Sequence, residues 1–196
     1  MRIFVAGATG VIGVRLVPLL VAEAHQVAGL TRSLEKADAL RELGAEPVVC
    51  DVFDTARLEA ALASFRPDAV VDELTDLPDD AAMLPKFRAA NARIRGEGTR
   101  NLLAAARAAR AERFLAQSTA WPIPGEGGVA IEELERSVLA AGGVVLRYGR
   151  LYGPGTYYET EPPPPPPRVH VDEAARATVA ALGAPSGVVE IVDEER

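Results

Sequence analysis

Three glycines near the start of the chain have a spacing that could hold a phosphate. They belong to the run Gly7-Ala8-Thr9-Gly10-Val11-Ile12-Gly13, which follows a short apolar stretch over 3–6 and leads into a helical pattern over 10–24. In such a turn Gly7 permits the sharp bend, Gly10 lets backbone N–H groups approach a pyrophosphate, and Gly13 lets the helix pack closely on the strand. We therefore predict that all seven residues form a dinucleotide-binding turn; the alternative is a structural glycine turn without a ligand.

The residue after the second apolar run, 26–31, should select the form of the nucleotide. An acidic residue there binds the 2′-hydroxyl of NAD, whereas an arginine can pair with the 2′-phosphate of NADP. Arg32 stands at this point, so we expect NADP, with NAD as the second choice; a solvated surface arginine is the alternative. Asp51 and Val52, after the third apolar run, are further candidates for cofactor contacts. Asp51 could accept a hydrogen bond from the adenine N6, or serve only in a turn.

Further polar groups follow the fourth apolar run, where open α/β sheets bind their ligands. They are Asp72, Glu73, Thr75 and Asp76. One of the acids could be a general acid or base with a shifted pKa. The alternative is a solvated loop, because Asp and Glu are mostly exposed in proteins.

Apolar runs that alternate with helical patterns must position these groups. The runs cover 3–6, 26–31, 47–50, 69–71, 113–117, 144–147 and 188–192, and the helical patterns cover 10–24, 34–43, 54–64, 79–110, 129–141 and 171–182. This alternation predicts an α/β fold with a doubly wound, mostly parallel Rossmann sheet and helices on both faces. We expect one domain over 1–196, which contains a proline-rich strap at 156–170. The six prolines Pro162–Pro167 should form an extended spacer in the strap.

Composition limits the classes of partner. The 196 residues include 48% hydrophobic and 25% charged residues, and the formal net charge is −7. An acidic chain without a basic patch argues against nucleic acid. The single cysteine, Cys50, allows no internal disulfide and suits a reducing cytoplasm. We expect no signal peptide and no membrane span, because the longest apolar stretch is far shorter than about 20 residues.

Several segments together resemble the short-chain dehydrogenase/reductase superfamily, in its extended or atypical NAD-dependent epimerase/dehydratase branch. Besides the glycine turn they are Asn91 with Gly98-Thr99-Arg100-Asn101-Leu102-Leu103, Gln117-Ser118-Thr119, Arg147-Tyr148-Gly149-Arg150-Leu151-Tyr152-Gly153-Pro154-Gly155, and Val169-His170-Val171-Asp172-Glu173-Ala174-Ala175. The resemblance covers most of the chain but does not identify a reaction.

The resemblance implies roles for individual residues. Ser118, or Thr119 in a register shifted by one, would hold the substrate oxygen. The segment 148–155 would pass near the nicotinamide. From its position Tyr152 is a candidate proton donor, and the alternative is a role in core packing or in lid contacts. His170 would be structural rather than catalytic, and a homodimer would form through the helices at 79–110 and 129–141.

Two departures from the family pattern bear on the chemistry. The family's catalytic Tyr-x-x-x-Lys pair, in which lysine lowers the tyrosine pKa, is absent in every register. In addition, only 41 residues follow Gly155, so any substrate cover must be small or come from a second subunit. A proton would then come from Tyr152 or Tyr157, from an acid after the fourth strand, or from water.

These observations favour an NADP(H)-binding oxidoreductase that acts on a small carbonyl or hydroxyl substrate. Two alternatives remain open. One is an isomerase or cyclase that reuses the fold without hydride transfer, and the other is a non-enzymatic NADP redox sensor. A closed apolar pocket beside the nicotinamide would favour an enzyme.

Overall fold

The central element is a seven-stranded parallel sheet with the strand order β3-β2-β1-β4-β5-β6-β9. The computed structural model describes residues 1–160 and 162–194. The strands are β1 (Arg2–Ala6), β2 (Gln26–Thr31), β3 (Glu46–Val49), β4 (Ala69–Asp72), β5 (Arg113–Thr119), β6 (Val144–Tyr148) and β9 (Gly187–Ile191). The order reverses between β1 and β4, and ligands of open α/β sheets bind at such a point. The predicted doubly wound Rossmann sheet is confirmed.

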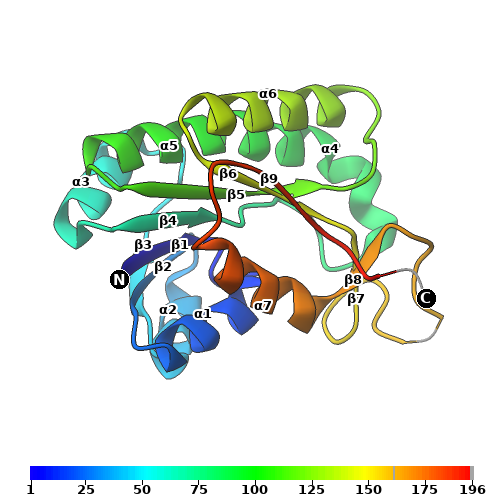
Figure 1. The fold of residues 1–196 in the computed structure, drawn as a ribbon, viewed down its shortest axis with the longest axis horizontal. Helices are drawn as coiled ribbons and strands as arrows, with labels where there is room; N and C mark the ends of the chain where they lie inside the picture. Colours follow the sequence, from blue (N-terminus) through cyan, green and yellow to red (C-terminus); the bar gives the residue numbers. More distant parts are fainter. Residues whose placement is uncertain (161, 195–196) are drawn as a thin grey trace.

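Helices cover both faces of this sheet (Figure 1). One face carries α1 (Gly13–Ala22), α2 (Ala37–Glu42) and α7 (Val171–Ala181), and the other carries α3 (Thr55–Phe65), α4 (Leu84–Arg93), α5 (Thr99–Ala108) and α6 (Glu126–Ala140). The first face is packed around Leu16, Leu20 and Leu115, and the second around Leu62, Leu102 and Val145. Residues of one strand thus alternate between two separate apolar cores, so the strands read as continuous apolar runs.

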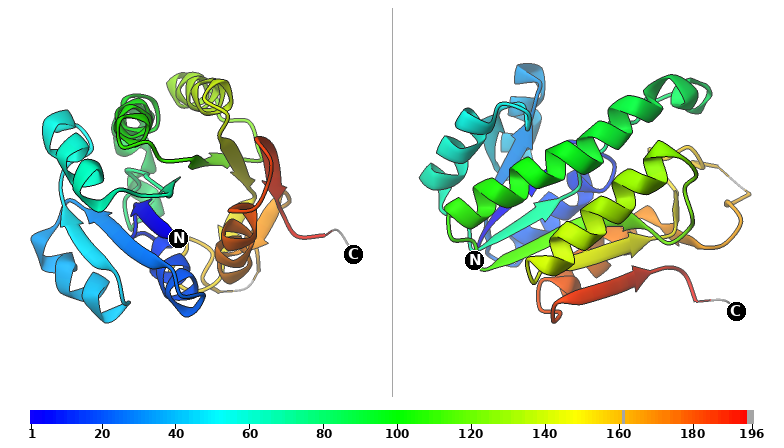
Figure 2. Two further views of the ribbon diagram at one scale, coloured as in Figure 1. Left: turned by 60° about the vertical axis from the view of Figure 1, so that its left-hand side comes forward. Right: turned by 90° about the horizontal axis from the view of Figure 1, so that it is seen from above.

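The long helical pattern at 79–110 is not one helix. It is divided into a 3₁₀ turn η2 (Ala81–Met83), α4, a π-helical turn η3 (Ile94–Gly98) and α5. Pro85 lies in the first turn of α4, where its missing N–H costs no hydrogen bond. Figure 2 shows α4 and α5 end to end along one line, with α6 beside them. The predicted helix at 34–43 is likewise divided into η1 (Leu34–Lys36) and α2.

A small parallel sheet at the carboxyl edge was not predicted. It pairs β7 (Arg150–Tyr152) with β8 (Arg168–His170). The proline run between them bends at Pro162 and again over Pro165–Pro167, so the expected extended spacer is interrupted by bends. Arginine side chains hold the run instead: Arg150 donates to the carbonyls of Pro165 and Pro166, and Arg168 to that of Pro164.

No helix among the described residues is long and apolar enough to cross a membrane. The same residues contain no group of three His, Cys, Asp or Glu side chains arranged to hold a metal ion.

Replacing the six prolines Pro162–Pro167 by a Gly/Ser linker should lower the free energy of unfolding by about 2–4 kcal/mol. The reason is the larger entropy of the unfolded linker, since each proline typically contributes about 0.4–1 kcal/mol. Thermal unfolding measures the loss, and calorimetry with NADPH should find nucleotide affinity nearly unchanged. A large drop in nucleotide affinity would instead make the strap part of the binding site.

Candidate nucleotide-binding site

The glycine turn leaves β1 at a point where the backbone has no room for side chains. Gly7 has a φ of 81°, and a Cβ there would lie 2.5 Å from the carbonyl oxygen of Glu73. A Cβ on Gly13 would collide with the carbonyl oxygen of Gly7. The Gly10 N–H donates to the Gly7 carbonyl at 2.9 Å, which closes the turn directly before α1. The turn is therefore a cradle of bare backbone at a helix N-terminus, which fits a pyrophosphate.

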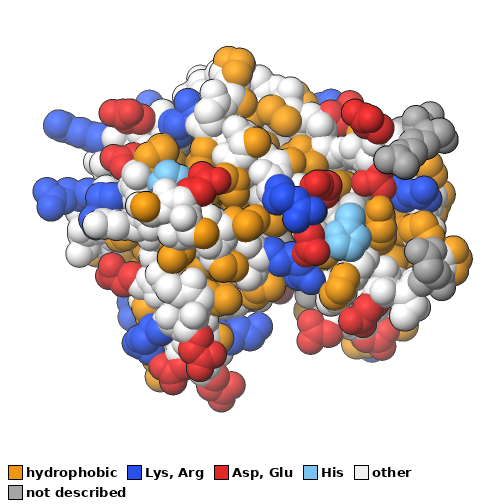
Figure 3. Space-filling model, turned by 60° about the horizontal axis from the view of Figure 1, so that its bottom comes forward, with side chains coloured by type: hydrophobic (Ala, Val, Ile, Leu, Met, Phe, Trp, Pro, Cys, Tyr) orange, Lys and Arg blue, Asp and Glu red, His pale blue; other side chains and the backbone are white. Residues whose placement is uncertain are grey.

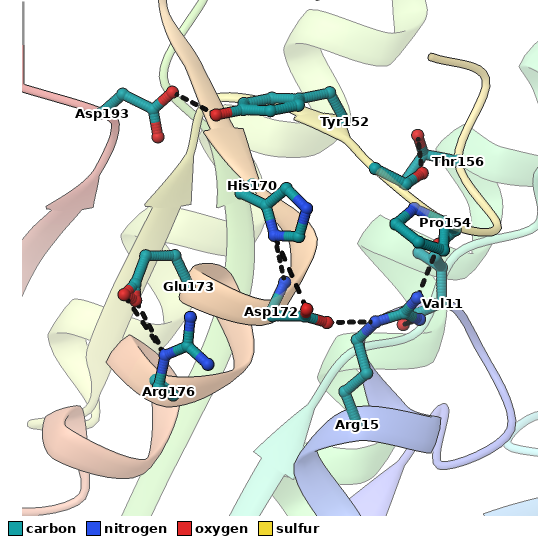
Figure 4. A network of polar contacts seen from close by, with 11 residues as sticks. Val11, Arg15, Tyr152, Pro154, Thr156, His170, Asp172, Glu173, Arg176 and Asp193 are labelled. Atoms are coloured by element: carbon teal, nitrogen blue, oxygen red, sulfur yellow. Dashed lines mark hydrogen bonds and ion pairs between the residues drawn. The ribbon is translucent and has the colours of Figure 1, made fainter. Parts of the chain in front are cut away.

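Arg15 on α1 ties this turn to the segment after β7 and to the start of α7 (Figure 4). Its guanidinium donates to the Val11 carbonyl at 2.8 Å, to the Pro154 carbonyl at 2.6 Å and to Asp172 at 2.7 Å. Three segments far apart in the sequence thereby meet at one side chain. Sequence reasoning missed this role, because a basic residue in a helical pattern usually marks a solvated face.

A histidine close to the Arg15 contacts has a structural role. His170 Nδ1 accepts from the backbone N–H of Asp172 at 3.3 Å and caps the start of α7. The space-filling view in Figure 3 shows acidic and basic side chains gathered around a histidine on the face that carries α1 and α7. Arg176 and Glu173 form a further ion pair there, at 2.8 Å.

Tyr152 is engaged at the same edge. Its hydroxyl donates to Asp193 at 2.9 Å, and its ring meets the His170 ring edge-on at 5.2 Å. The hydroxyl of Tyr157 donates to the carbonyl of Pro78, in the loop after β4. The role of either tyrosine as a proton donor stays a prediction.

The candidates for cofactor selection lie at the ends of β2 and β3. Arg32 is half exposed and forms an ion pair with Asp76 at 3.2 Å. Asp51 accepts from the backbone N–H of Phe53 at 3.0 Å, which is the turn role considered above. Val52 is buried, and its carbonyl accepts from Asn101 of α5 at 3.2 Å. Contacts of these residues with adenosine stay predictions.

Ser118 faces α6. It is 1% exposed, and its hydroxyl donates to Glu135 at 2.5 Å. Arg147, its register partner on β6, binds the same carboxylate at 2.8 and 2.5 Å. The pKa of Glu135 is lowered, mainly because Arg147 donates hydrogen bonds to this carboxylate. In this arrangement Ser118 joins the sheet to α6, and its role at a substrate oxygen stays a prediction.

The Thr119 side chain points to the opposite face of the sheet from Ser118, because successive side chains of a strand alternate between faces. It is the last residue of β5, it is only partly buried, and its hydroxyl donates to the carbonyl of Trp121 at 3.0 Å. Of the two hydroxyls suggested by the family resemblance, Thr119 is therefore the more accessible.

A buried polar cluster lies directly behind the glycine turn. Glu73 accepts from Tyr148 at 2.8 Å, and the Tyr148 hydroxyl also contacts Thr178 of α7 at 2.6 Å. Burial raises the pKa of Glu73 to about 8, so this acid is mostly protonated at neutral pH. Its Oε2 is fully buried and has no hydrogen-bond partner among the described residues. Burial likewise raises the pKa of Tyr148, so this tyrosine keeps its proton.

Asp72 and Arg95 extend the cluster towards α5. Asp72 accepts from Thr99 at 2.7 Å and from the Leu74 N–H at 3.1 Å, and burial raises its pKa to about 6. Arg95, in the π turn η3, is 5% exposed and interacts electrostatically with both acids. Two of the four polar residues noted after the fourth strand are thus core residues. The solvated-loop alternative is wrong for Asp72 and Glu73.

The fold and this turn define a Rossmann dinucleotide-binding protein. A family model described as NAD(P)H-binding matches residues 7–142. The chain belongs to this NAD(P)H-binding family, and the glycine cradle fits such a cofactor.

Similar proteins include reductases. The chain is 37% identical over 240 aligned positions to 3-diazoavenalumate denitrifying reductase from a Streptomyces species, with 100% of this chain and 77% of the relative covered. Since this chain has 196 residues, the relative contains segments that it lacks. A second relative is a 4-hydroxy-2-methyl-3-oxo-4-farnesyl-3,4-dihydroquinoline-1-oxide ketoreductase from Stigmatella aurantiaca. This chain is 35% identical to it over 122 residues, with 61% of this chain and 34% of that protein covered.

Solved structures with the same fold include epimerases. UDP-glucose 4-epimerase from Thermus thermophilus in complex with NAD superimposes with a TM-score of 0.80 at 21% identity, with 100% of this chain and 78% of that chain covered. The Thermotoga maritima UDP-glucose 4-epimerase gives a TM-score of 0.80 at 19% identity, with the same coverage. These likenesses show the fold alone.

Glu73→Gln should remove a pH-dependent loss of stability. Between its unfolded pKa near 4.5 and its folded pKa of about 8, Glu73 holds a proton only in the folded state. The free energy of unfolding of the wild type therefore falls as the pH rises through this interval. Relative to the wild type, the variant should gain on the order of 2–4 kcal/mol between pH 5 and pH 8.

Urea unfolding at several pH values measures this difference. The Gln side chain still accepts from Tyr148, so the geometry is kept. Exposed Glu112→Gln is the matched control, and it should follow the pH profile of the wild type. A pH-independent difference for Glu73→Gln would show that Glu73 is ionised in the folded protein.

Proposed function

We propose that the protein is an NADPH-dependent reductase whose substrate accepts hydride without a proton from a side chain. A small aromatic diazo compound, which loses its nitrogen as N₂, is the substrate class that fits. The observation that carries this proposal is the combination of a complete nucleotide cradle with hydroxyls that are already engaged. Ser118 donates to Glu135, and Tyr152 donates to Asp193.

Reduction of a ketone or aldehyde needs a proton on the oxygen as hydride reaches the carbon. In the related short-chain enzymes a Tyr-x-x-x-Lys pair supplies it, and this chain has no such pair. A tyrosine without a neighbouring cation has a pKa near 10 and is a poor acid at neutral pH. Tyr148, which is buried beside Glu73, is a still weaker acid. The site therefore favours a reaction in which a leaving group carries away the electron pair that a carbonyl oxygen would hold, so that no proton is needed.

A diazonium carbon meets this requirement. NADPH would supply the hydride when bound. A new C–H bond would form with its electron pair, and the C–N bond would break with its pair leaving on N₂. The balance is ArN₂⁺ + NADPH → ArH + N₂ + NADP⁺. The name of the Streptomyces relative, a denitrifying reductase of a diazo compound, supports this chemistry. The residues of this chain would bind and orient, with the glycine turn at the pyrophosphate and Thr119 nearest the reacting ring.

Mixing NADPH with 3-diazo-4-hydroxybenzoate tests the reaction. We expect NADPH consumption, N₂ release and 4-hydroxybenzoate in equal amounts, faster than in a mixture without protein, and deuterium from [4-²H]NADPH on the ring. Benzaldehyde and cyclohexanone should be reduced slowly or not at all. Rapid reduction of these carbonyls without N₂ release from the diazo compound would favour the carbonyl reductase instead. Nucleotide binding without any turnover would favour the redox sensor.

The second part of the proposal is the choice of NADP, for which Arg32 is responsible. A guanidinium that binds a phosphate contributes about 1.5–3 kcal/mol, and each tenfold in affinity is about 1.4 kcal/mol. We expect Arg32→Ala to weaken NADPH binding about tenfold or more and to leave NADH binding within about twofold. Calorimetric titration of both nucleotides measures this. Equal losses for NADPH and NADH would place the 2′-phosphate elsewhere.

A further inference from the structure

The Arg32–Asp76 ion pair lies across the end of the strand that carries the glycine turn. Arg32 follows β2 and Asp76 lies in the loop after β4, and β1 is hydrogen-bonded to both of these strands. The 3.2 Å contact between Arg32 Nη2 and Asp76 Oδ1 therefore spans the carboxyl end of β1, where Gly7 begins the turn. This is the crevice in which Rossmann folds hold the adenosine half of a dinucleotide.

Asp76 is held in place independently of Arg32. Its backbone N–H donates to the side-chain oxygen of Asn91 on α4 at 3.0 Å. Two residues further along, the carbonyl of Pro78 accepts from the Tyr157 hydroxyl. Only 23% of the Asp76 side chain is exposed, against 54% for Arg32. The carboxylate is thus the more enclosed partner, on an anchored backbone, and the arginine is the more exposed one.

We propose that Asp76 is a specificity-determining residue, which competes with the 2′-phosphate of NADP for the Arg32 guanidinium. This inference rests on the proposed role of Arg32 at that phosphate. A phosphate carries up to two negative charges, so it must displace or repel the carboxylate before it gains the fork of donors. The 2′-hydroxyl of NAD is uncharged, so it can bind without displacing the carboxylate. Asp76 therefore lowers the affinity for NADPH while it leaves the affinity for NADH nearly unchanged.

Direct binding of NADPH and NADH to four proteins tests this proposal. They are the wild type, Asp76→Asn, Asp76→Glu and Arg32→Ala, and the nicotinamide fluorescence of each nucleotide reports its dissociation constant without turnover. Asp76→Asn should bind NADPH about three- to tenfold more tightly than the wild type, and NADH within twofold. Asp76→Glu keeps the charge and should stay close to the wild type. The gain should shrink in 0.5 M salt, because the contact is partly exposed.

Two further variants exclude trivial explanations. Glu173→Gln breaks another partly exposed ion pair, with Arg176 on α7, and should leave both dissociation constants unchanged. In the Arg32→Ala background, Asp76→Asn should change the NADPH affinity by less than twofold, since the contested partner is gone.

The failures of the two proposals are distinguishable. If Arg32→Ala binds NADPH as the wild type does, the proposed NADP recognition is wrong. If Arg32→Ala weakens NADPH binding while Asp76→Asn leaves it unchanged, or tightens NADH equally, the competition by Asp76 is overturned and the NADP recognition stands. An Asp76→Asn gain that persists in the Arg32→Ala background would reduce Asp76 to a general repulsive charge and would also overturn the competition.

Discussion

The site depends on one close backbone contact, between the glycine turn after β1 and the peptide that follows β4. A single methyl group on Gly7 would lie 2.5 Å from the carbonyl oxygen of Glu73, so the two segments can meet only as bare backbone. The Glu73 N–H in turn donates to the Ala6 carbonyl at 2.9 Å. This contact positions the turn at the switch point of the sheet. It also places the side chain of Glu73 behind the turn, away from solvent.

That position explains why an acid can occupy the core. An ionised carboxylate without a compensating partner is costly in an apolar interior, and proteins avoid the cost by keeping the group protonated. Glu73 takes this course, with its pKa raised to about 8 and a hydrogen bond from Tyr148. Arg95 brings a positive charge towards both buried acids from the π turn η3, and π turns often occur at functional sites. A neutral Glu73 and a protonated Tyr148 keep charge away from the rear of the turn.

The sequence predicted best the features that depend on local patterns. The strand at 26–31 matches β2 at both ends, and the helical pattern over 54–64 matches α3 to within one residue at each end. The break at 94–98 and the β7–β8 pair escaped prediction, since an alanine-rich helical pattern continues through a π turn and three-residue strands carry little signal. The direction of Ser118 could not be predicted either. A shift of one residue turns a strand side chain to the other face. Ser118 lies on the face that α6 covers, and its partner Glu135 is known only once α6 is packed there.

The charges beside the turn indicate where nucleotides are distinguished. The chain has 28 acidic and 21 basic residues, yet its cofactor is an anion. Arg15 and Arg32 flank the turn, and each already has a carboxylate partner. The attraction for the pyrophosphate therefore comes mainly from backbone N–H groups at the start of α1, which serve NAD and NADP alike. Arg15 is held by three hydrogen bonds and keeps the turn in place, whereas Arg32 is held by one contact and can change its partner. The proposed recognition of a 2′-phosphate would therefore take place at the edge between β2 and β4.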